Sequence, residues 1–248
     1  MPKKLKYILA IIMLFGCANQ ALAKQSLSIV VVANFISTME PLVKEFEQRH
    51  DVEVRIIPGS TGKLYAQIMS GAPYDLFFSA DIKHVSMLIE QGKAMAESRK
   101  VYAIGKLALI APGFDAKSEG DKILVRLKHI AIANPALAPY GEAAKSVMIN
   151  LNYWDELQDK LVIGESVGQT MQFIVSGAVD GGLVALSQVI AQKIPAEEAW
   201  IVPQTLYQPL IQEAVIINPK NPSSELFMRF IESKAARAII AKNGYSNG

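Results

Sequence analysis

Short apolar runs alternate with amphipathic segments along most of the chain. Leu27–Ala33 is an apolar run rich in valine and broken only by Ser28, which is typical of a strand buried on both faces. Ser37 or Thr38 is expected to cap the helix that follows, with Pro41 in its first turn. The apolar residues of this helix recur at helical spacing: Met39, Leu42, Val43 and Phe46. The order of buried strand, loop and helix then repeats, which predicts a mainly parallel sheet with helices on both faces.

The same alternation starts again after two extended runs, 101–104 and 106–111. Strands are expected at 130–133, 161–163, 181–185 and 212–218, and helices at 142–151, 186–192 and 233–242, with Ser223-Ser224 capping a helix before the last one. No Gly/Ser-rich or Pro-rich linker separates the two blocks. We therefore expect the chain to cross between two lobes through extended strands, once near Gly105 and once near Pro209. The predicted lobes are 24–105 plus 210–248, and 106–209.

The first 23 residues have the pattern of a secretory signal peptide. Three lysines precede the apolar run Tyr7–Phe15, no acidic residue is present, and Ala21-Leu22-Ala23 supplies a small-x-small cleavage site. The apolar run is too short to span a bilayer as a stable helix. We expect residues 1–23 to be removed and the mature protein to be exported to a periplasm. An uncleaved anchor, or lipid attachment at Cys17, is the less favoured alternative because Phe15 is bulky for a lipoprotein site.

Composition narrows the function classes. Apolar residues make up 51% of the 248 positions, so a substantial core is expected. Removal of the signal segment takes three lysines from a formal charge of +2 and leaves a slightly acidic chain, so nucleic acid is not an expected partner. Cys17 is the only cysteine, which leaves the mature chain without a disulfide, a thiolate metal site or a cysteine nucleophile.

Four loops share one design, in which a buried strand ends, small or polar residues turn, and a helix begins. In open parallel sheets, ligands bind at these carboxyl ends of strands. Free amides at helix N-termini favour anions, and we expect those of Tyr140 and Gly141 to be free. None of the loops contains Arg or His, and the nearest cation is Lys63. The pattern predicts a site in which neutral donors hold a fully deprotonated anion. The loops are Ala33-Asn34-Phe35, Gly59–Gly62, Ala138–Gly141 and Ser166-Val167-Gly168.

Other polar residues have simpler interpretations. The three histidines, at 50, 84 and 129, are far apart in sequence, so no bound metal cation is expected. Asp75 and Asp81 are expected to form turns and helix caps rather than an acid–base pair. Ser60 and Ser187 lack the context of a hydrolase nucleophile, so we expect no enzyme activity. An iron(III) site is a weaker alternative that would use tyrosines without a paired histidine or carboxylate, namely Tyr65, Tyr74, Tyr102 and Tyr140.

Several of these segments together resemble the periplasmic molybdate-binding proteins of ABC importers. The resemblance covers nearly the whole mature chain. Its most specific part is the uninterrupted stretch Gly71-Ala72-Pro73-Tyr74-Asp75-Leu76-Phe77 with Ser79-Ala80-Asp81 after it. Further matches are Ala33-Asn34-Phe35, Gly59–Leu64, Ile132–Pro135 with Ala138–Gly141, Glu165-Ser166-Val167 and Gly182–Ala185.

The resemblance implies a type II periplasmic-binding-protein fold of two α/β lobes with two inter-lobe crossovers. It also implies molybdate or tungstate as the ligand, a membrane permease as the partner, no cofactor and a monomer. The implied donors are the side chains of Asn34 and Thr61 and the amides of Tyr140 and Val167. Some members of the family carry a tyrosine hydroxyl where Ala185 stands, so we expect either that four loops bind the ligand or that Asn34 or Ser60 supplies a substitute donor. Sulfate or another oxyanion remains the alternative ligand, and molybdate and tungstate are too similar in size to be separated by this reasoning.

Overall fold

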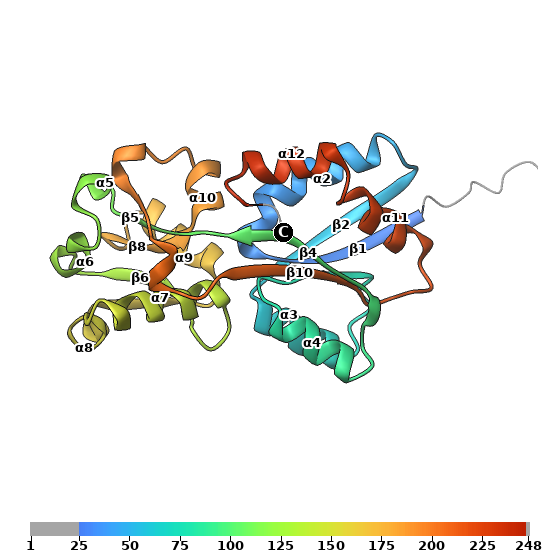
Figure 1. Cartoon of the computed structure of the whole chain (residues 1–248), viewed down its shortest axis with the longest axis horizontal. Helices are drawn as coiled ribbons and strands as arrows, with labels where there is room; N and C mark the ends of the chain where they lie inside the picture. The colour runs from blue at the N-terminus through green and yellow to red at the C-terminus, as the bar shows by residue number, and fades with distance from the viewer. Residues whose placement is uncertain (1–24, 247–248) are drawn as a thin grey trace, which may run out of the picture.

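Two five-stranded sheets, each flanked by helices, form two lobes that lie side by side (Figure 1). The structure is a computed structural model that describes residues 25–246. The predicted signal peptide, its cleavage site and Cys17 lie outside the described residues. The strands are β1 (Gln25–Val32), β2 (Val52–Gly59), β3 (Leu76–Phe78), β4 (Met95–Gly105), β5 (Leu107–Ile110), β6 (Ile130–Ala133), β7 (Leu161–Gly164), β8 (Gly181–Ala185), β9 (Ala199–Ile201) and β10 (Leu210–Ile216).

The helices connect the strands and cover the faces of both sheets. The α-helices are α2 (Ile36–Glu47), α3 (Thr61–Met69), α4 (Lys83–Glu90), α5 (Ala116–Glu119), α6 (Lys122–Arg126), α7 (Pro139–Asn150), α8 (Trp154–Leu157), α9 (Val167–Val175), α10 (Leu186–Ala191), α11 (Pro222–Phe230) and α12 (Lys234–Lys242). The 3-10 helices are η1 (Ala33–Phe35), η2 (Gln158–Lys160), η3 (Ala196–Glu198) and η4 (Gln204–Leu206).

Both sheets follow the same plan. The first has the order β2-β1-β3-β10-β4 and the second β7-β6-β8-β5-β9. In each, the first three strands are parallel and the fourth is antiparallel to its neighbours. The predicted two-lobed α/β fold is confirmed, but the sheets are mixed rather than mainly parallel. The antiparallel strands, β5 and β10, each follow a crossover, and each runs through its sheet against the direction of the parallel strands.

The crossovers join the lobes through two adjacent segments. β4 ends at Gly105 and β5 begins at Leu107, while β10 re-enters the first sheet at Leu210. Gly105 is paired with Leu210, so the outgoing and returning strands lie next to each other (Figure 1). The Leu107 amide also donates a hydrogen bond to the Tyr207 hydroxyl, at 3.0 Å. We call the two adjacent segments, residues 105–107 and 207–210, the hinge.

Three local predictions about helix starts are wrong. η1 leads directly into α2, which begins at Ile36, so Ser37 and Thr38 lie inside its first turn and neither caps it. Pro41 lies inside α2, beyond the first turn. The cap of α11 is the Asn221 side chain, which accepts from the Ser223 amide, and Pro222 then occupies the first helical position, where its missing N–H costs little.

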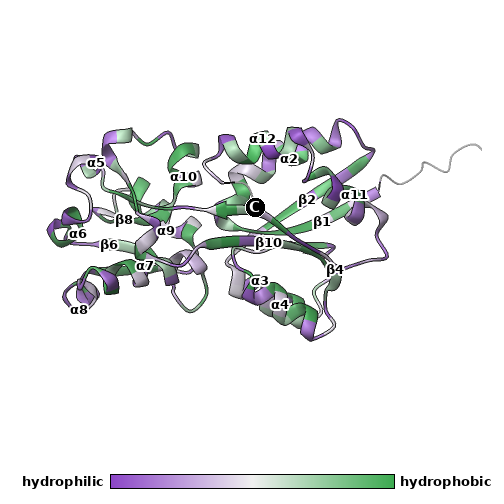
Figure 2. Cartoon of the chain, in the orientation of Figure 1, coloured by the Kyte–Doolittle hydropathy of each residue, from purple (hydrophilic) through white to green (hydrophobic). Residues whose placement is uncertain are grey.

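Apolar side chains fill the space between sheets and helices. Every residue of β1 from Leu27 onward is buried, as the apolar run predicts. Hydrophobic residues concentrate on the central strands, and hydrophilic residues on the outer faces of the helices (Figure 2). Among the described residues, no helix combines the length and apolar character needed to cross a membrane. This core holds the strand ends, and therefore the loops that follow them, in fixed positions.

Candidate oxyanion-binding site

The four predicted loops meet between the lobes, in a closed arrangement. The Gly62 amide, at the start of α3 in the first lobe, donates to the Leu137 carbonyl of the second lobe at 3.0 Å. A Cβ atom at Gly168, at the start of α9, would lie 3.2 Å from the Cβ of Ala33 in η1. Loops from opposite lobes thus touch at two separate places. The sequence placed these loops at strand ends, and the structure brings loops of opposite lobes into contact.

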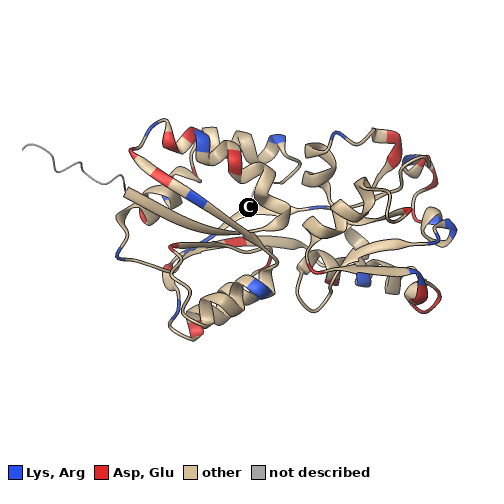
Figure 3. Ribbon diagram, turned by 180° about the vertical axis from the view of Figure 1, so that it is seen from behind, with Lys and Arg blue, Asp and Glu red and all other residues tan. Residues whose placement is uncertain are grey.

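None of the four loops carries a buried charged side chain. Lys63, the cation nearest the loops, forms an ion pair across the cleft with Glu165, and both side chains are largely exposed. The buried charged residues among those described are Asp75 and Glu213, which belong to none of the four loops. Figure 3 shows charges of both signs spread over the outer parts of both lobes. A ligand between the loops would therefore meet neutral hydrogen-bond donors.

Three of the predicted site residues lie in the first turn of a helix. Thr61, Tyr140 and Val167 belong to the first turns of α3, α7 and α9, and all three are buried. Amides in a first helical turn have no acceptor within their helix, and the helix dipole adds positive potential there. The Gly141 amide is an exception to the sequence prediction, because it donates to the Ala138 carbonyl at 2.8 Å. Both residues lie in the first turn of α7, but the Gly141 amide is already used in this bond, so the expectation that it is free is wrong.

Ser60 has a hydroxyl with no protein partner. It is the N-cap residue of α3, yet its side chain makes no capping hydrogen bond. Its Oγ is buried and unpaired within the described part of the chain. Buried polar atoms in native proteins nearly always have a partner, in the protein, in ordered water or in a ligand. The hydroxyls of Ser37 and Thr38, on the first turn of α2, are also unpaired. Ser60 is the one that belongs to a predicted ligand loop.

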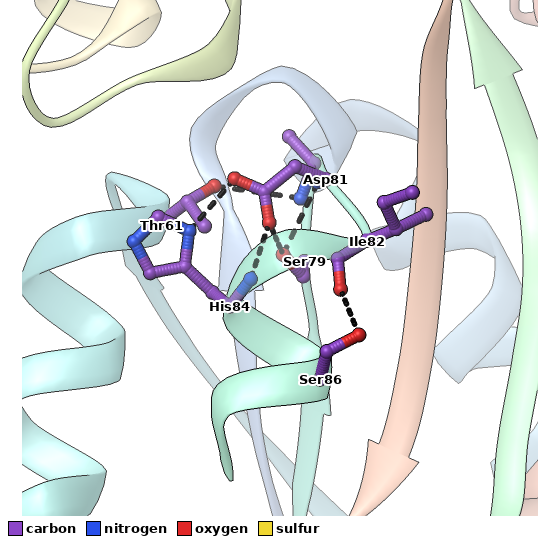
Figure 4. A network of polar contacts seen from close by, with 7 residues as sticks. Thr61, Ser79, Asp81, Ile82, His84 and Ser86 are labelled. Atoms are coloured by element: carbon purple, nitrogen blue, oxygen red, sulfur yellow. Dashed lines mark hydrogen bonds and ion pairs between the residues drawn. The ribbon is translucent and has the colours of Figure 1, made fainter. Parts of the chain in front are cut away.

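Thr61 lies beside a polar network that holds the loop after β3 (Figure 4). Its Oγ1 accepts a hydrogen bond from the Ala80 amide at 3.4 Å, which leaves the Thr61 hydroxyl proton free to donate. Asp81 accepts from the His84 amide at 2.9 Å and contacts the His84 ring at 2.7 Å. The N-cap residue of α4 is Ile82, one position after Asp81, but the Asp81 carboxylate bonds to the first-turn amide of His84, so it acts at the helix start and fixes the loop that faces Thr61.

Asn34 is buried, but its side chain points into a different set of contacts. Its Nδ2 donates to Gln212 Oε1 and to the Tyr245 hydroxyl, each at 3.0 Å. Its main-chain carbonyl accepts from the hydroxyls of Ser187 and Tyr245, at 2.8 and 2.7 Å. Both side-chain N–H groups of Asn34 are therefore already used. Of the two substitutes proposed for the hydroxyl missing at Ala185, only Ser60 has a free donor.

The tyrosines near the hinge do not favour iron(III). Tyr102, Tyr140 and Tyr245, which we call the hinge tyrosines, are buried, and burial raises the pKa of each above the ordinary value for tyrosine. Their hydroxyls are already used in hydrogen bonds, to Gln212 for Tyr102 and Tyr140 and to Asn34 and Ser187 for Tyr245. Tyr74 bonds to Gln67 on α3 instead, away from the hinge. No group of three or more His, Cys, Asp or Glu side chains is gathered anywhere in residues 25–246.

Sequence reasoning missed the residues that connect the two lobes behind the loops. Gln212, Ser187 and Tyr245 are buried and bond to Asn34 or to its main chain. One signal for Gln212 was present, because it and the adjacent Glu213 are the polar residues of a buried strand that is otherwise apolar. No comparable signal marked Ser187 or Tyr245, whose importance depends on contacts between distant parts of the chain.

Comparisons with known proteins agree with this fold. The model for the bacterial extracellular solute-binding protein family matches residues 27–246. The molybdate-binding protein ModA of Azotobacter vinelandii is 36% identical over 94% of this chain and 93% of its own length. ModA of Rhodobacter capsulatus is 35% identical over 95% and 94%. The structure of the Azotobacter vinelandii periplasmic molybdate-binding protein superposes with a TM-score of 0.85, at 41% identity, and covers 90% of this chain and 99% of that one. These matches confirm the resemblance stated from the sequence motifs. The chain therefore belongs to the family of bacterial extracellular solute-binding proteins.

Proposed function

We propose that the protein captures molybdate, or the similar tungstate ion, between its lobes and delivers it to a membrane permease for ABC-type import. The observation that carries this proposal is an uncharged, enclosed meeting point of loops at which the buried Ser60 hydroxyl has no protein partner. The sequence identity of 35–36% with molybdate-binding relatives, over nearly the whole chain, supports the choice of ligand.

The proposed donors come from both lobes. The first lobe supplies the hydroxyls of Ser60 and Thr61, and the second supplies the first-turn amides of Tyr140 and Val167. The side-chain amide of Asn34 is not among the proposed donors, because both of its N–H groups are bonded within the protein. Asn34 instead anchors the loop that it belongs to. Neutral donors suit a doubly charged anion that has no proton to donate, because they offer it no acceptor.

Selection against sulfate is proposed to be steric. Molybdate and tungstate have longer bonds to oxygen than sulfate has, so a rigid cage that fits the larger ions would leave the hydrogen bonds to sulfate stretched. Each charge-assisted hydrogen bond is worth about 1.5–3 kcal/mol, so the weakening of several gives strong discrimination. The same argument does not separate molybdate from tungstate.

We also propose that the protein acts as a periplasmic monomer, without a cofactor, an enzymatic step or a nucleic-acid partner. Residues 1–23 would direct export. Residues 24–105 with 210–248 would form one lobe and 106–209 the other, and the closed form would be the one that the permease recognises.

A titration panel on ligand-stripped protein tests this function. Molybdate and tungstate should raise the melting temperature and release or absorb heat on binding, and sulfate and phosphate should do so only weakly. Stronger binding of sulfate than of molybdate would assign the alternative oxyanion. A visible tyrosinate charge-transfer band on addition of iron(III) would contradict an oxyanion site.

A further inference from the structure

A short chain of buried side chains crosses from one lobe to the other directly behind the ligand loops. Asn34 Nδ2 in the first lobe donates to Gln212 Oε1 at 3.0 Å. Gln212 Nε2 donates in turn to the Tyr140 hydroxyl in the second lobe at 3.2 Å. Both end residues belong to loops of the proposed site. The residue between them, Gln212, is fully buried and lies on β10, next to the point where the chain returns from the second lobe.

Three neighbours hold the side chain of Gln212 in place. Its Oε1 accepts from both Asn34 Nδ2 and the Tyr102 hydroxyl, the latter at 2.8 Å. Its Nε2 end reaches across the hinge to Tyr140. Both ends of the amide are therefore bonded to buried partners, which holds the side chain between the two loops.

The hinge backbone leaves room for this arrangement and for little else. A Cβ atom at Gly105 would lie 2.1 Å from the Tyr140 hydroxyl oxygen and 2.6 Å from Gln212 Nε2. Both distances are well inside van der Waals contact, so a side chain at this position would displace one of the two groups. A glycine at position 105 is therefore what allows the Tyr140 hydroxyl and the Gln212 amide to meet.

We propose that Gln212 is a positioning residue, whose amide holds the Asn34 loop and the Tyr140 loop at the separation at which they meet the anion. This inference rests on the function proposed above. A cage that selects by size needs a fixed distance between its two halves, and Gln212 is bonded to a ligand loop in each. Gln212 is not itself a proposed ligand donor, and it acts only through the two loops to which it is bonded. Its loss is therefore expected to change affinity and size selection together.

The test replaces Gln212 with methionine, which has a similar length and no hydrogen-bonding amide. In Gln212→Met, the Kd for molybdate should rise about 10- to 100-fold, because two bonds between the loops are lost. The preference for molybdate over sulfate, measured by competition, should fall as well. The matched control is Ser98→Ala, which removes a buried bond to the Ile216 amide at the far end of the same strand pair. The control should melt at a lower temperature and keep both the Kd and the preference.

A second variant keeps the inference testable if Gln212→Met does not fold. Tyr140→Phe removes the hydroxyl that accepts from Gln212 and leaves the Tyr140 amide in place, so it should weaken molybdate binding in the same direction. In the double variant, Tyr140→Phe should add little to the effect of Gln212→Met, since both cut the same connection.

Two outcomes would overturn the inference. One is a lower melting temperature with unchanged affinity and unchanged preference in Gln212→Met or Tyr140→Phe, which would make the network merely structural. The other is full additivity of the two substitutions. Failure of the wild-type protein to bind any oxyanion would instead refute the proposed function, and the wild-type titration shows which of the two ideas has failed.

Discussion

Replacement of Ser60 by alanine separates a ligand contact from a structural one. The Ser60 hydroxyl is buried and makes no hydrogen bond within the described residues, so its removal breaks no bond of the folded protein. An unpaired buried hydroxyl costs about 1–3 kcal/mol, so the ligand-free variant should melt at the same temperature as the wild type or higher. A bond from this hydroxyl to a doubly charged anion should be worth about 1.5–3 kcal/mol, which corresponds to a roughly 10- to 150-fold increase in Kd.

The assay is calorimetric titration of stripped protein with molybdate, combined with thermal unfolding in the absence of ligand. Ser233→Ala is the matched control, because Ser233 is also an N-cap residue but accepts a hydrogen bond from the Ala236 amide at 3.2 Å. Loss of that cap should cost about 1 kcal/mol and lower the melting temperature by about 2–4 °C, with no change in Kd. The reasoning would be refuted if Ser60→Ala bound molybdate as tightly as the wild type, or if it destabilised the ligand-free protein as the control does.

Four further outcomes are expected. Gly105→Ala should weaken molybdate binding and cost about 1–3 kcal/mol of stability, measured by titration and denaturant unfolding, because its Cβ collides with the Tyr140 hydroxyl. Thr61→Ala should raise the Kd by a factor equivalent to about 1–3 kcal/mol and, unlike Ser60→Ala, also lower stability, because it leaves the Ala80 amide without its acceptor. Lys63→Met should change affinity by no more than about 1 kcal/mol, and less at high salt, since its ion pair is mostly exposed. The hinge tyrosines have raised pKa values when folded, so their contribution to stability is intact below the unfolded pKa of about 10 and is lost as the pH rises further; melting temperatures recorded across alkaline pH check this.

The fold could be predicted well because its signals are local and repeated. Apolar runs such as Leu27–Ala33 mark strands buried on both faces, and helical spacing after each run marks the connecting helices. The mixed character of the sheets was harder to predict. An apolar run such as that of β10 is the same in either direction, so the sequence carries no sign that it lies antiparallel between β3 and β4.

The site could be predicted only in part, for a physical reason. A loop that follows a strand and starts a helix indicates free amides, which pointed to Tyr140, whereas Val167 was implied by the family resemblance; both lie in the first turn of a helix. Whether a side chain faces the ligand depends on its competing partners. Asn34 is an amide at a strand end, as expected, yet Gln212 and Tyr245 occupy both of its N–H groups. Those partners lie far away in sequence, and no local pattern announces them.

The place of Tyr245 has a practical consequence for anyone who handles this protein. Its hydroxyl contacts Asn34 in one lobe and Ser187 in the other, and the next residue, Ser246, forms a bridge with Ile104 of β4. A fluorophore attached beside Tyr245 would therefore lie against the segment that joins the two lobes. Its emission should respond to any change in the separation of the lobes, and a bulky group at this position should disturb the contacts between them.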